Sequence, residues 1–71
     1  MNTPDAKRKI EELVGRIDVL KHEIRHAHEQ AAKYRSLNEP AHVREAEQDA
    51  ERMDVRLRSL EQDLAKLKKF W

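Results

Sequence analysis

The sequence predicts an all-α protein that folds as an antiparallel two-helix hairpin of the coiled-coil type. Three observations support this fold class. The 71 residues are rich in Glu, Lys, Arg, Gln, Leu and Ala, which are good helix formers. Apolar residues recur with heptad spacing in each half of the chain, and Pro40 separates the two halves. A chain of this length accommodates one domain, so we expect a single hairpin over 1–71.

The first helix is expected over about 4–35. Thr3 can cap it, Pro4 suits the first helical position, and Asp5 favours the positive end of the helix dipole. Gly15 lies inside the apolar pattern and costs about 1 kcal/mol relative to alanine, which we expect the helix to tolerate.

A turn is expected over about 36–39, followed by a second helix over about 40–69. Pro40 disfavours helical geometry at the residue before it and has no backbone N–H to donate, which argues against one continuous helix. Asn38 or Ser36 is expected to cap the second helix.

The apolar residues form two seams, in which positions a and d of the heptad abcdefg are hydrophobic. The first seam comprises Ala6, Ile10, Leu13, Ile17, Leu20, Ile24, Ala27, Ala31 and Tyr34, and the second comprises Val43, Ala46, Ala50, Met53, Leu57, Leu60, Leu64, Leu67 and Trp71. When the seams are paired antiparallel, the facing residue numbers add up to 77 in every layer, from Tyr34 with Val43 to Ala6 with Trp71. Small residues then face small ones near the turn, and large residues face large ones further out.

Charged residues that flank the seams agree with this register. It brings together four pairs, namely Arg16 with Asp63, Glu23 with Arg56, Lys21 with Asp54, and His28 with Glu47. Each surface pair contributes only about 0–1 kcal/mol, so the pairs matter as evidence for the register rather than for stability.

A hairpin of this size buries little apolar surface, and small chains often gain stability by oligomerisation. Four helices can share the same a and d positions in one core. We therefore expect the hairpin to assemble into a four-helix bundle homodimer.

Composition argues against several classes of function. The chain has no Cys, one Gly and a formal net charge of +1, which argues against a disulfide framework, a phosphate-binding loop and general attraction to nucleic acid. It contains no apolar run of about 18 residues and no N-terminal apolar stretch like a signal peptide, so we expect a cytoplasmic protein without a membrane span. No nucleophile with a neighbouring base is apparent, so we expect neither an enzyme nor a cofactor.

Residues 22–26, HEIRH, match H-E-x-x-H and resemble the zinc-metalloprotease motif, which implies two zinc-binding histidines and a glutamate base. Ala32 stands where one extended form of the motif has its third histidine ligand, and a hairpin has no second lobe to wall a catalytic cleft. His22, His26 and Glu29 lie on one stripe of the helix and are candidate ligands for Zn²⁺ or Ni²⁺. Such surface patterns are common by chance, so we predict no metal centre and keep these three residues as the remote alternative.

The open end of the hairpin carries the candidate partner-binding residues. The register brings together six basic and two aromatic residues, namely Lys7, Arg8, Lys9, Lys66, Lys68, Lys69, Phe70 and Trp71. Lys7 and Lys68 face each other, a like-charge pair that stability alone does not favour. Such an end suits an acidic protein, a phosphate backbone or an anionic surface. The alternative is that the lysines complement the helix dipole and that Trp71 covers the last core layer.

The sequence is best explained as a small protein–protein interaction module (an adaptor, regulator or inhibitor) that presents a rigid hairpin to a protein partner. In architecture the chain also resembles the plasmid copy-number regulator Rop, a dimeric helical hairpin that binds paired RNA loops. That resemblance is one of shape and size and carries over no site residues. It implies nucleic-acid binding as the alternative function, through the basic open end.

Overall fold

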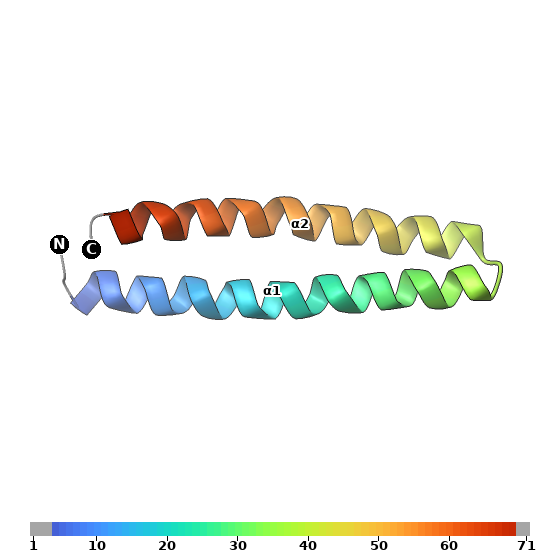
Figure 1. The fold of residues 1–71 in the computed structure, drawn as a ribbon, viewed down its shortest axis with the longest axis horizontal. Coiled ribbons are helices and arrows are strands. Elements are labelled where there is room, and N and C mark those ends of the chain that lie inside the picture. The colour runs from blue at the N-terminus through green and yellow to red at the C-terminus, as the bar shows by residue number, and fades with distance from the viewer. Residues whose placement is uncertain (1–3, 70–71) are drawn as a thin grey trace.

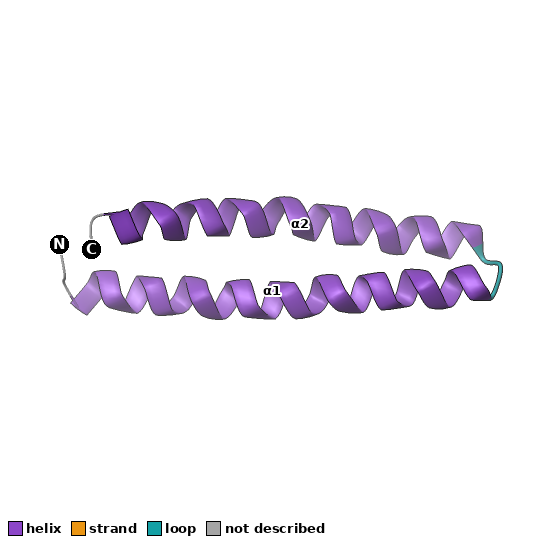
Figure 2. Cartoon of the chain, in the orientation of Figure 1, coloured by secondary structure: helices purple, strands orange, loops and turns teal. Residues whose placement is uncertain are grey.

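The chain folds into two long helices that pack against each other as a hairpin (Figure 1). The computed structural model describes residues 4–69. Helix α1 spans Pro4–Ser36 and helix α2 spans Pro40–Lys69, and they run antiparallel over nearly their whole length. A short connection joins them, and the described residues contain no strand (Figure 2).

The hairpin is a rod rather than a globule. Its dimensions are 53 × 14 × 11 Å, and its radius of gyration is 16.1 Å. A compact domain of this length has a radius of gyration of about 11 Å. The long dimension agrees with the length of α1, since 33 residues at about 1.5 Å each span about 50 Å.

Both helices begin where the sequence analysis placed them, and α1 extends one residue further than expected, to Ser36. Gly15 lies within α1 without interrupting it, and a Cβ added there would meet no atom within 4 Å. The expected cap Thr3 lies outside the described residues.

Asn38 terminates α1 in a Schellman motif. Its φ of 56° lies in the left-handed region, which Asn tolerates better than most residues. The Glu39 N–H donates to the Tyr34 carbonyl at 3.0 Å, and the Asn38 N–H donates to the Arg35 carbonyl at 3.2 Å. These are the two hydrogen bonds that define the motif, and they satisfy carbonyls that the end of the helix would otherwise leave unpaired.

The expectation that Asn38 or Ser36 caps α2 is therefore wrong. The Ser36 hydroxyl donates to the Lys33 carbonyl at 2.9 Å, and Asn38 is the left-handed residue of the motif that ends α1. Glu39 precedes α2 instead, because its carbonyl accepts the first helical hydrogen bond, from the Val43 N–H at 3.1 Å. Pro40 then occupies the first helical position, where its missing N–H costs nothing.

The burial pattern confirms the two apolar seams. Every seam residue that the structure describes is buried or half-buried. The buried ones are Leu13, Ile17, Leu20, Ala27, Ala31, Ala46 and Ala50. Among the described residues outside the seams, only Gln30 and Asp54 are half-buried, and the rest are exposed. The two-helix packing thus buries the predicted core, but the leucines of α2 remain half-covered.

The ion pairs beside the seams are not those expected from the sequence. None of the four anticipated pairs forms an ion pair within 4 Å among residues 4–69. Glu47 instead pairs with Arg35, whose Nη2 donates to Glu47 Oε1 at 2.6 Å. Both side chains are more than half exposed, so this pair contributes little to stability.

Candidate functional site

The packed seams leave two long faces on the hairpin. In an antiparallel pair, the e positions of both helices flank the seam on one side and the g positions flank it on the other. The Lys21 face carries the e positions, which are Lys7, Val14, Lys21, His28, Arg35, Glu47, Asp54, Glu61 and Lys68. The Gln30 face carries the g positions, which are Lys9, Arg16, Glu23, Gln30, His42, Asp49, Arg56 and Asp63.

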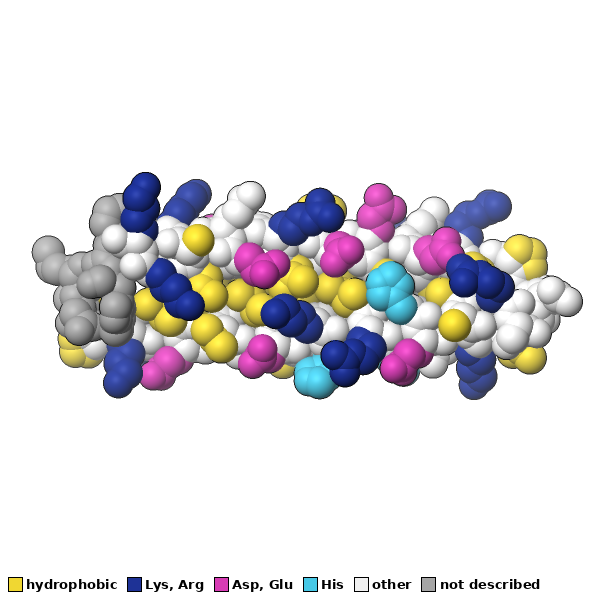
Figure 3. All heavy atoms as spheres, viewed as in Figure 1, with side chains coloured by type: hydrophobic (Ala, Val, Ile, Leu, Met, Phe, Trp, Pro, Cys, Tyr) yellow, Lys and Arg dark blue, Asp and Glu magenta, His cyan; other side chains and the backbone are white. Residues whose placement is uncertain are grey.

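Apolar side chains are accessible along the hairpin rather than hidden in a closed core. Figure 3 shows a stripe of hydrophobic side chains running between the two helices, with charged side chains on both flanks. On the Lys21 face, Val14 is 40% exposed and lines a shallow groove with Ile17 and Leu64. The apolar surface on this face therefore continues outward from the core.

The two faces differ in charge balance. The described grooves along the Lys21 face are lined by five basic residues, Lys7, Lys21, Arg35, Arg44 and Lys68, and by five acidic ones, Glu11, Asp18, Glu39, Glu47 and Glu61. Those along the Gln30 face are lined by Glu11, Glu12, Glu23, Glu45 and Asp49 but only by Arg16 and Arg56 on the basic side. The groove linings are thus balanced in charge on the Lys21 face and net acidic on the Gln30 face, although the g positions of the Gln30 face themselves hold three basic and three acidic residues.

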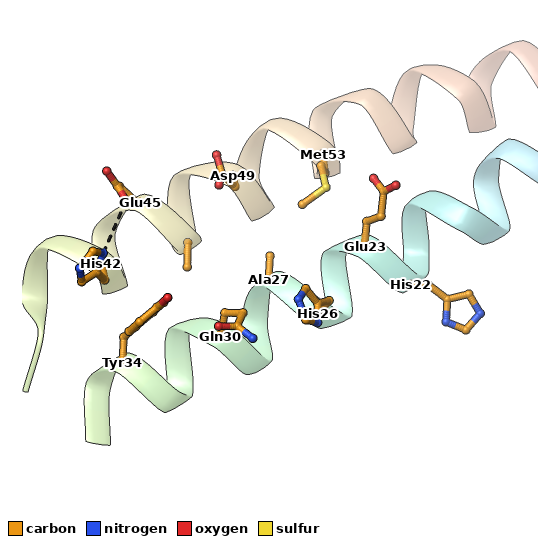
Figure 4. Close-up of a pocket in the computed structure, with 11 residues that line it drawn as sticks. His22, Glu23, His26, Ala27, Gln30, Tyr34, His42, Glu45, Asp49 and Met53 are labelled. Atoms are coloured by element: carbon orange, nitrogen blue, oxygen red, sulfur yellow. Dashed lines mark ion pairs between the residues drawn. The ribbon is translucent and has the colours of Figure 1, made fainter. Parts of the chain in front are cut away.

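A groove lies on the Gln30 face next to the turn, and we refer to it as the turn groove (Figure 4). It has a volume of about 550 Å³. Apolar and aromatic residues from both helices form its floor, namely Ala27, Tyr34, Ala46 and Met53. Gln30 and three histidines, His22, His26 and His42, also line it. Its acidic lining residues are Glu23, Glu45 and Asp49, and no Lys or Arg lines it.

An aromatic contact closes the end of the turn groove. The rings of Tyr34 and His42 stack with their centroids 4.9 Å apart and their planes inclined by 29°. In Figure 4 the Tyr34 side chain reaches from α1 toward α2 and His42 lies beside it. His42 Nδ1 also lies 3.7 Å from Glu45 Oε2, which orients both side chains at the rim.

The turn groove was not predictable from the sequence. Its floor exists because Ala27 and Ala46 lie in successive layers of the seam, facing Ala50 and Ala31, and these layers offer only methyl groups to fill the space between the flanks. The alanine layers and the g positions beside them were visible in the sequence. The stacking of Tyr34 on His42 was not, because it depends on the exact path of the turn.

The structure brings some of the predicted open-end residues together. Lys7 and Lys68 line the same shallow groove, beside Ile10. Arg8, Lys9, Lys66 and Lys69 are exposed in the first turns of α1 and the last turn of α2. Phe70 and Trp71 lie outside the described residues.

The candidate metal ligands are not grouped. Among residues 4–69, no three His, Cys, Asp or Glu side chains are arranged so that they could hold a metal ion. His22 points away from α2, whereas Glu23 extends toward it (Figure 4). His22, His26 and Glu29 therefore share a helix stripe without forming a ligand set in this structure.

The chemistry of the described surface is that of solvated side chains. No polar or charged residue among residues 4–69 is buried, and no buried side-chain nitrogen or oxygen there lacks a hydrogen-bond partner. The ionisable groups consequently lie on the surface, where a partner can reach them.

No helix within the described part of the chain is long and apolar enough to span a bilayer. Comparison of the chain with models of protein families, with curated proteins and with solved structures finds no match in any of the three.

Proposed function

We propose that the chain is a non-enzymatic protein–protein interaction module whose first partner is a second copy of itself, with which it forms a four-helix bundle. In this role it acts as an adaptor, regulator or inhibitor that presents helix faces to other proteins. Bundle completion is a common way for helical hairpins to bury residual apolar surface.

The observation that carries the proposal is the surface that the hairpin leaves uncovered. One chain exposes 5877 Å², whereas a compact protein of 8.4 kDa exposes about 4,600 Å². A compact dimer of twice that mass exposes about 7,600 Å², so pairing two such hairpins can bury on the order of 4,000 Å². An interface of that size falls in the range of obligate homodimers.

The Lys21 face is the one best suited to a second copy. A two-fold interface brings the same surface of both protomers together, so that surface must complement itself. The Lys21 face meets this requirement because its groove-lining charges are balanced, and because Val14 extends its apolar surface beyond the seam. Its half-buried Leu64 would become covered in the bundle.

Sedimentation equilibrium of the full chain over a range of concentrations tests this proposal. We expect a dimer, and we expect Val14→Lys to weaken it at least about tenfold because a charge then enters an apolar contact. Lys at position 14 can pair with Glu61 or Asp18 within its own hairpin, so the fold should persist. The control is Val55→Lys, since Val55 is 63% exposed and lines none of the described grooves.

Two results would contradict this proposal. One is a monomer at all concentrations up to the millimolar range. The other is a dimer that Val14→Lys and Val55→Lys weaken equally, which would place the interface elsewhere.

The second candidate function is binding to nucleic acid through the open end, and the juxtaposition of Lys7 and Lys68 favours it. Phosphate contacts make such binding strongly salt-dependent. A titration of RNA and of DNA at increasing salt should show binding that Lys68→Glu weakens, with a smaller salt dependence, and that Lys33→Glu, near the turn, leaves nearly unchanged. Absence of binding at low salt would exclude this function.

A further inference from the structure

We infer that the turn groove binds an amphipathic helix of a partner protein, one whose apolar stripe is flanked by Lys and Arg. This inference rests on the proposed function in that it treats the chain as an interaction module. It goes further by assigning a second, separate surface and the chemistry of its partner.

The shape of the turn groove fits a short helix. Its lining residues run from His22 to Tyr34 on α1 and from His42 to Met53 on α2. At about 1.5 Å per residue, each stretch is about 18 Å long, which corresponds to about three helical turns. A third helix laid along this groove would cover it over its whole length, which is the usual arrangement of a helix bound between two others.

The floor of the groove can accept apolar side chains. Ala27 and Ala46 are buried and small, so the centre of the floor is low. Tyr34 and Met53 are half-buried at its two ends, and each retains apolar surface that a bound side chain can cover. Leu or Met side chains spaced one turn apart on a partner helix would fill the low centre and contact both ends.

The charges of the groove determine which helix fits. Glu45 and Asp49 stand one helical turn apart on α2, and Glu23 stands on α1 across the groove. A helix in the groove would therefore have carboxylates on both sides. Arg52 Nη1 lies 3.8 Å from Asp49 Oδ1, but both side chains are more than half exposed and Arg52 does not line the groove, so this pair neutralises little of the acidic rim. Lys and Arg at the flanking positions of that helix complement this arrangement, and Asp or Glu there would be repelled.

A second copy of the chain fits this groove less well. Stacking two Gln30 faces turn to turn would bring together two sets of the same three carboxylates. Stacking them turn to open end would place those carboxylates against a groove with Glu11, Glu12 and Glu23 beside only two arginines. The balanced Lys21 face has no such conflict, so the two faces can serve different partners.

Three labelled 18-residue peptides test the inference with the full chain. The first has Leu at a and d positions and Lys at e and g positions, the second has Glu in place of the Lys, and the third keeps Lys but has Ser in place of Leu. Fluorescence anisotropy should show that the first binds at least about tenfold more tightly than either of the others. Equal binding of the Lys and Glu peptides, or of the Leu and Ser peptides, would overturn the inference.

Matched charge reversals locate the binding surface. Asp49→Arg should weaken the first peptide about three- to tenfold, because it replaces an attraction by a repulsion. Glu51→Arg makes the same change in charge on the outer surface of α2, where it lines none of the described grooves, and should have little effect. Equal losses in the two variants would mean non-specific attraction and would overturn the inference.

Sedimentation of the same samples separates this inference from the proposed function. A dimer that binds no peptide contradicts the turn-groove inference and leaves the dimer proposal standing. A monomer that binds the Lys peptide with the Asp49 dependence described above supports the inference and contradicts the dimer.

Discussion

The half of the hairpin next to the turn and the half next to the termini pack with side chains of different size. Near the turn, the buried layers are alanines, including Ala31 and Ala46. Toward the open end, Leu13 and Ile17 of α1 are buried, but Leu60 and Leu64 of α2 are only half-buried. Two helices alone suffice to bury these alanines and the α1 leucines of the seam, whereas they leave part of each α2 leucine exposed.

The helices therefore pack most closely in one half of the hairpin and bury most of their apolar surface in the other. The turn half is closely packed and gains little from each layer, because an alanine side chain contributes only about one methyl group. The open half holds most of the apolar area, and part of it is still accessible. We therefore expect the free energy of unfolding to depend chiefly on the open half. The distance between the two helices should depend on the small side chains of the turn half.

The largest effect should come from removing a buried leucine from the central layer, where the leucine-rich half begins. Leu20 is 7% exposed, and Leu20→Ala should lower the free energy of unfolding by about 2–4 kcal/mol because it leaves a cavity. Urea denaturation followed by circular dichroism measures the loss, at a concentration that keeps the oligomeric state constant. Leu37→Ala is the control, since Leu37 is 57% exposed and should change stability by less than about 0.5 kcal/mol. Similar losses in both variants would contradict the assignment of the core to the seams.

The close approach of the helices in the turn half can be tested by enlarging a side chain. Ala31 is 3% exposed, and Ala31→Leu should destabilise the hairpin by about 1–3 kcal/mol because there is no room for the added carbons. The neighbouring Ala32 is exposed, so Ala32→Leu should be nearly neutral in the same denaturation experiment. If the two variants are equally stable, the alanine layers are not closely packed.

A smaller effect is expected at the turn itself. Asn38 has a φ of 56°, so Asn38→Ala should cost about 1 kcal/mol, whereas Asn38→Gly should be neutral or slightly stabilising. Thermal melting of the two variants beside the parent chain measures this difference. Identical melting temperatures for the Ala and Gly variants would show that residue 38 does not adopt the left-handed conformation.

The smallest effect concerns the flanking charges. A double-mutant cycle on Arg35 and Glu47 should give a coupling energy of about 0.2–1 kcal/mol that falls in 1 M salt. The same cycle on Lys21 and Asp54, where no ion pair within 4 Å is formed, should give a value close to zero. A larger coupling energy between Lys21 and Asp54 would support the ion pair that the sequence predicted and contradict its absence from the structure.

The main features of the fold were predictable from the sequence because they depend on spacing. The heptad positions identified the residues that become buried, and Pro40 located the break between the helices. The function of Asn38 was misjudged, because an Asn before a helix suits both the cap of the next helix and the left-handed residue after the previous one. Only the hydrogen bonds of the turn distinguish these two roles.

The candidate sites were less predictable, because they depend on contacts between the helices. The register correctly brought Lys7 beside Lys68. It also placed His28 beside Glu47, but the longer Arg35 side chain reaches that carboxylate instead. The turn groove depends on what fills the space above Ala27 and Ala46, and a list of seam residues does not reveal an empty space.

We expect the short connection between the helices also to set the order in which the hairpin folds. Tyr34 and Val43 are separated by only nine positions in the chain, whereas Ile10 and Leu67 are separated by 57. Because the entropy lost on closing a loop increases with its length, layers near the turn form at the lowest cost and each one shortens the loop for the next. Substitutions near Asn38 should then slow folding, while those near Ile10 should mainly speed unfolding. We therefore expect the closely packed alanine layers, which bury little apolar area, to act as the nucleus on which the leucine-rich half is assembled.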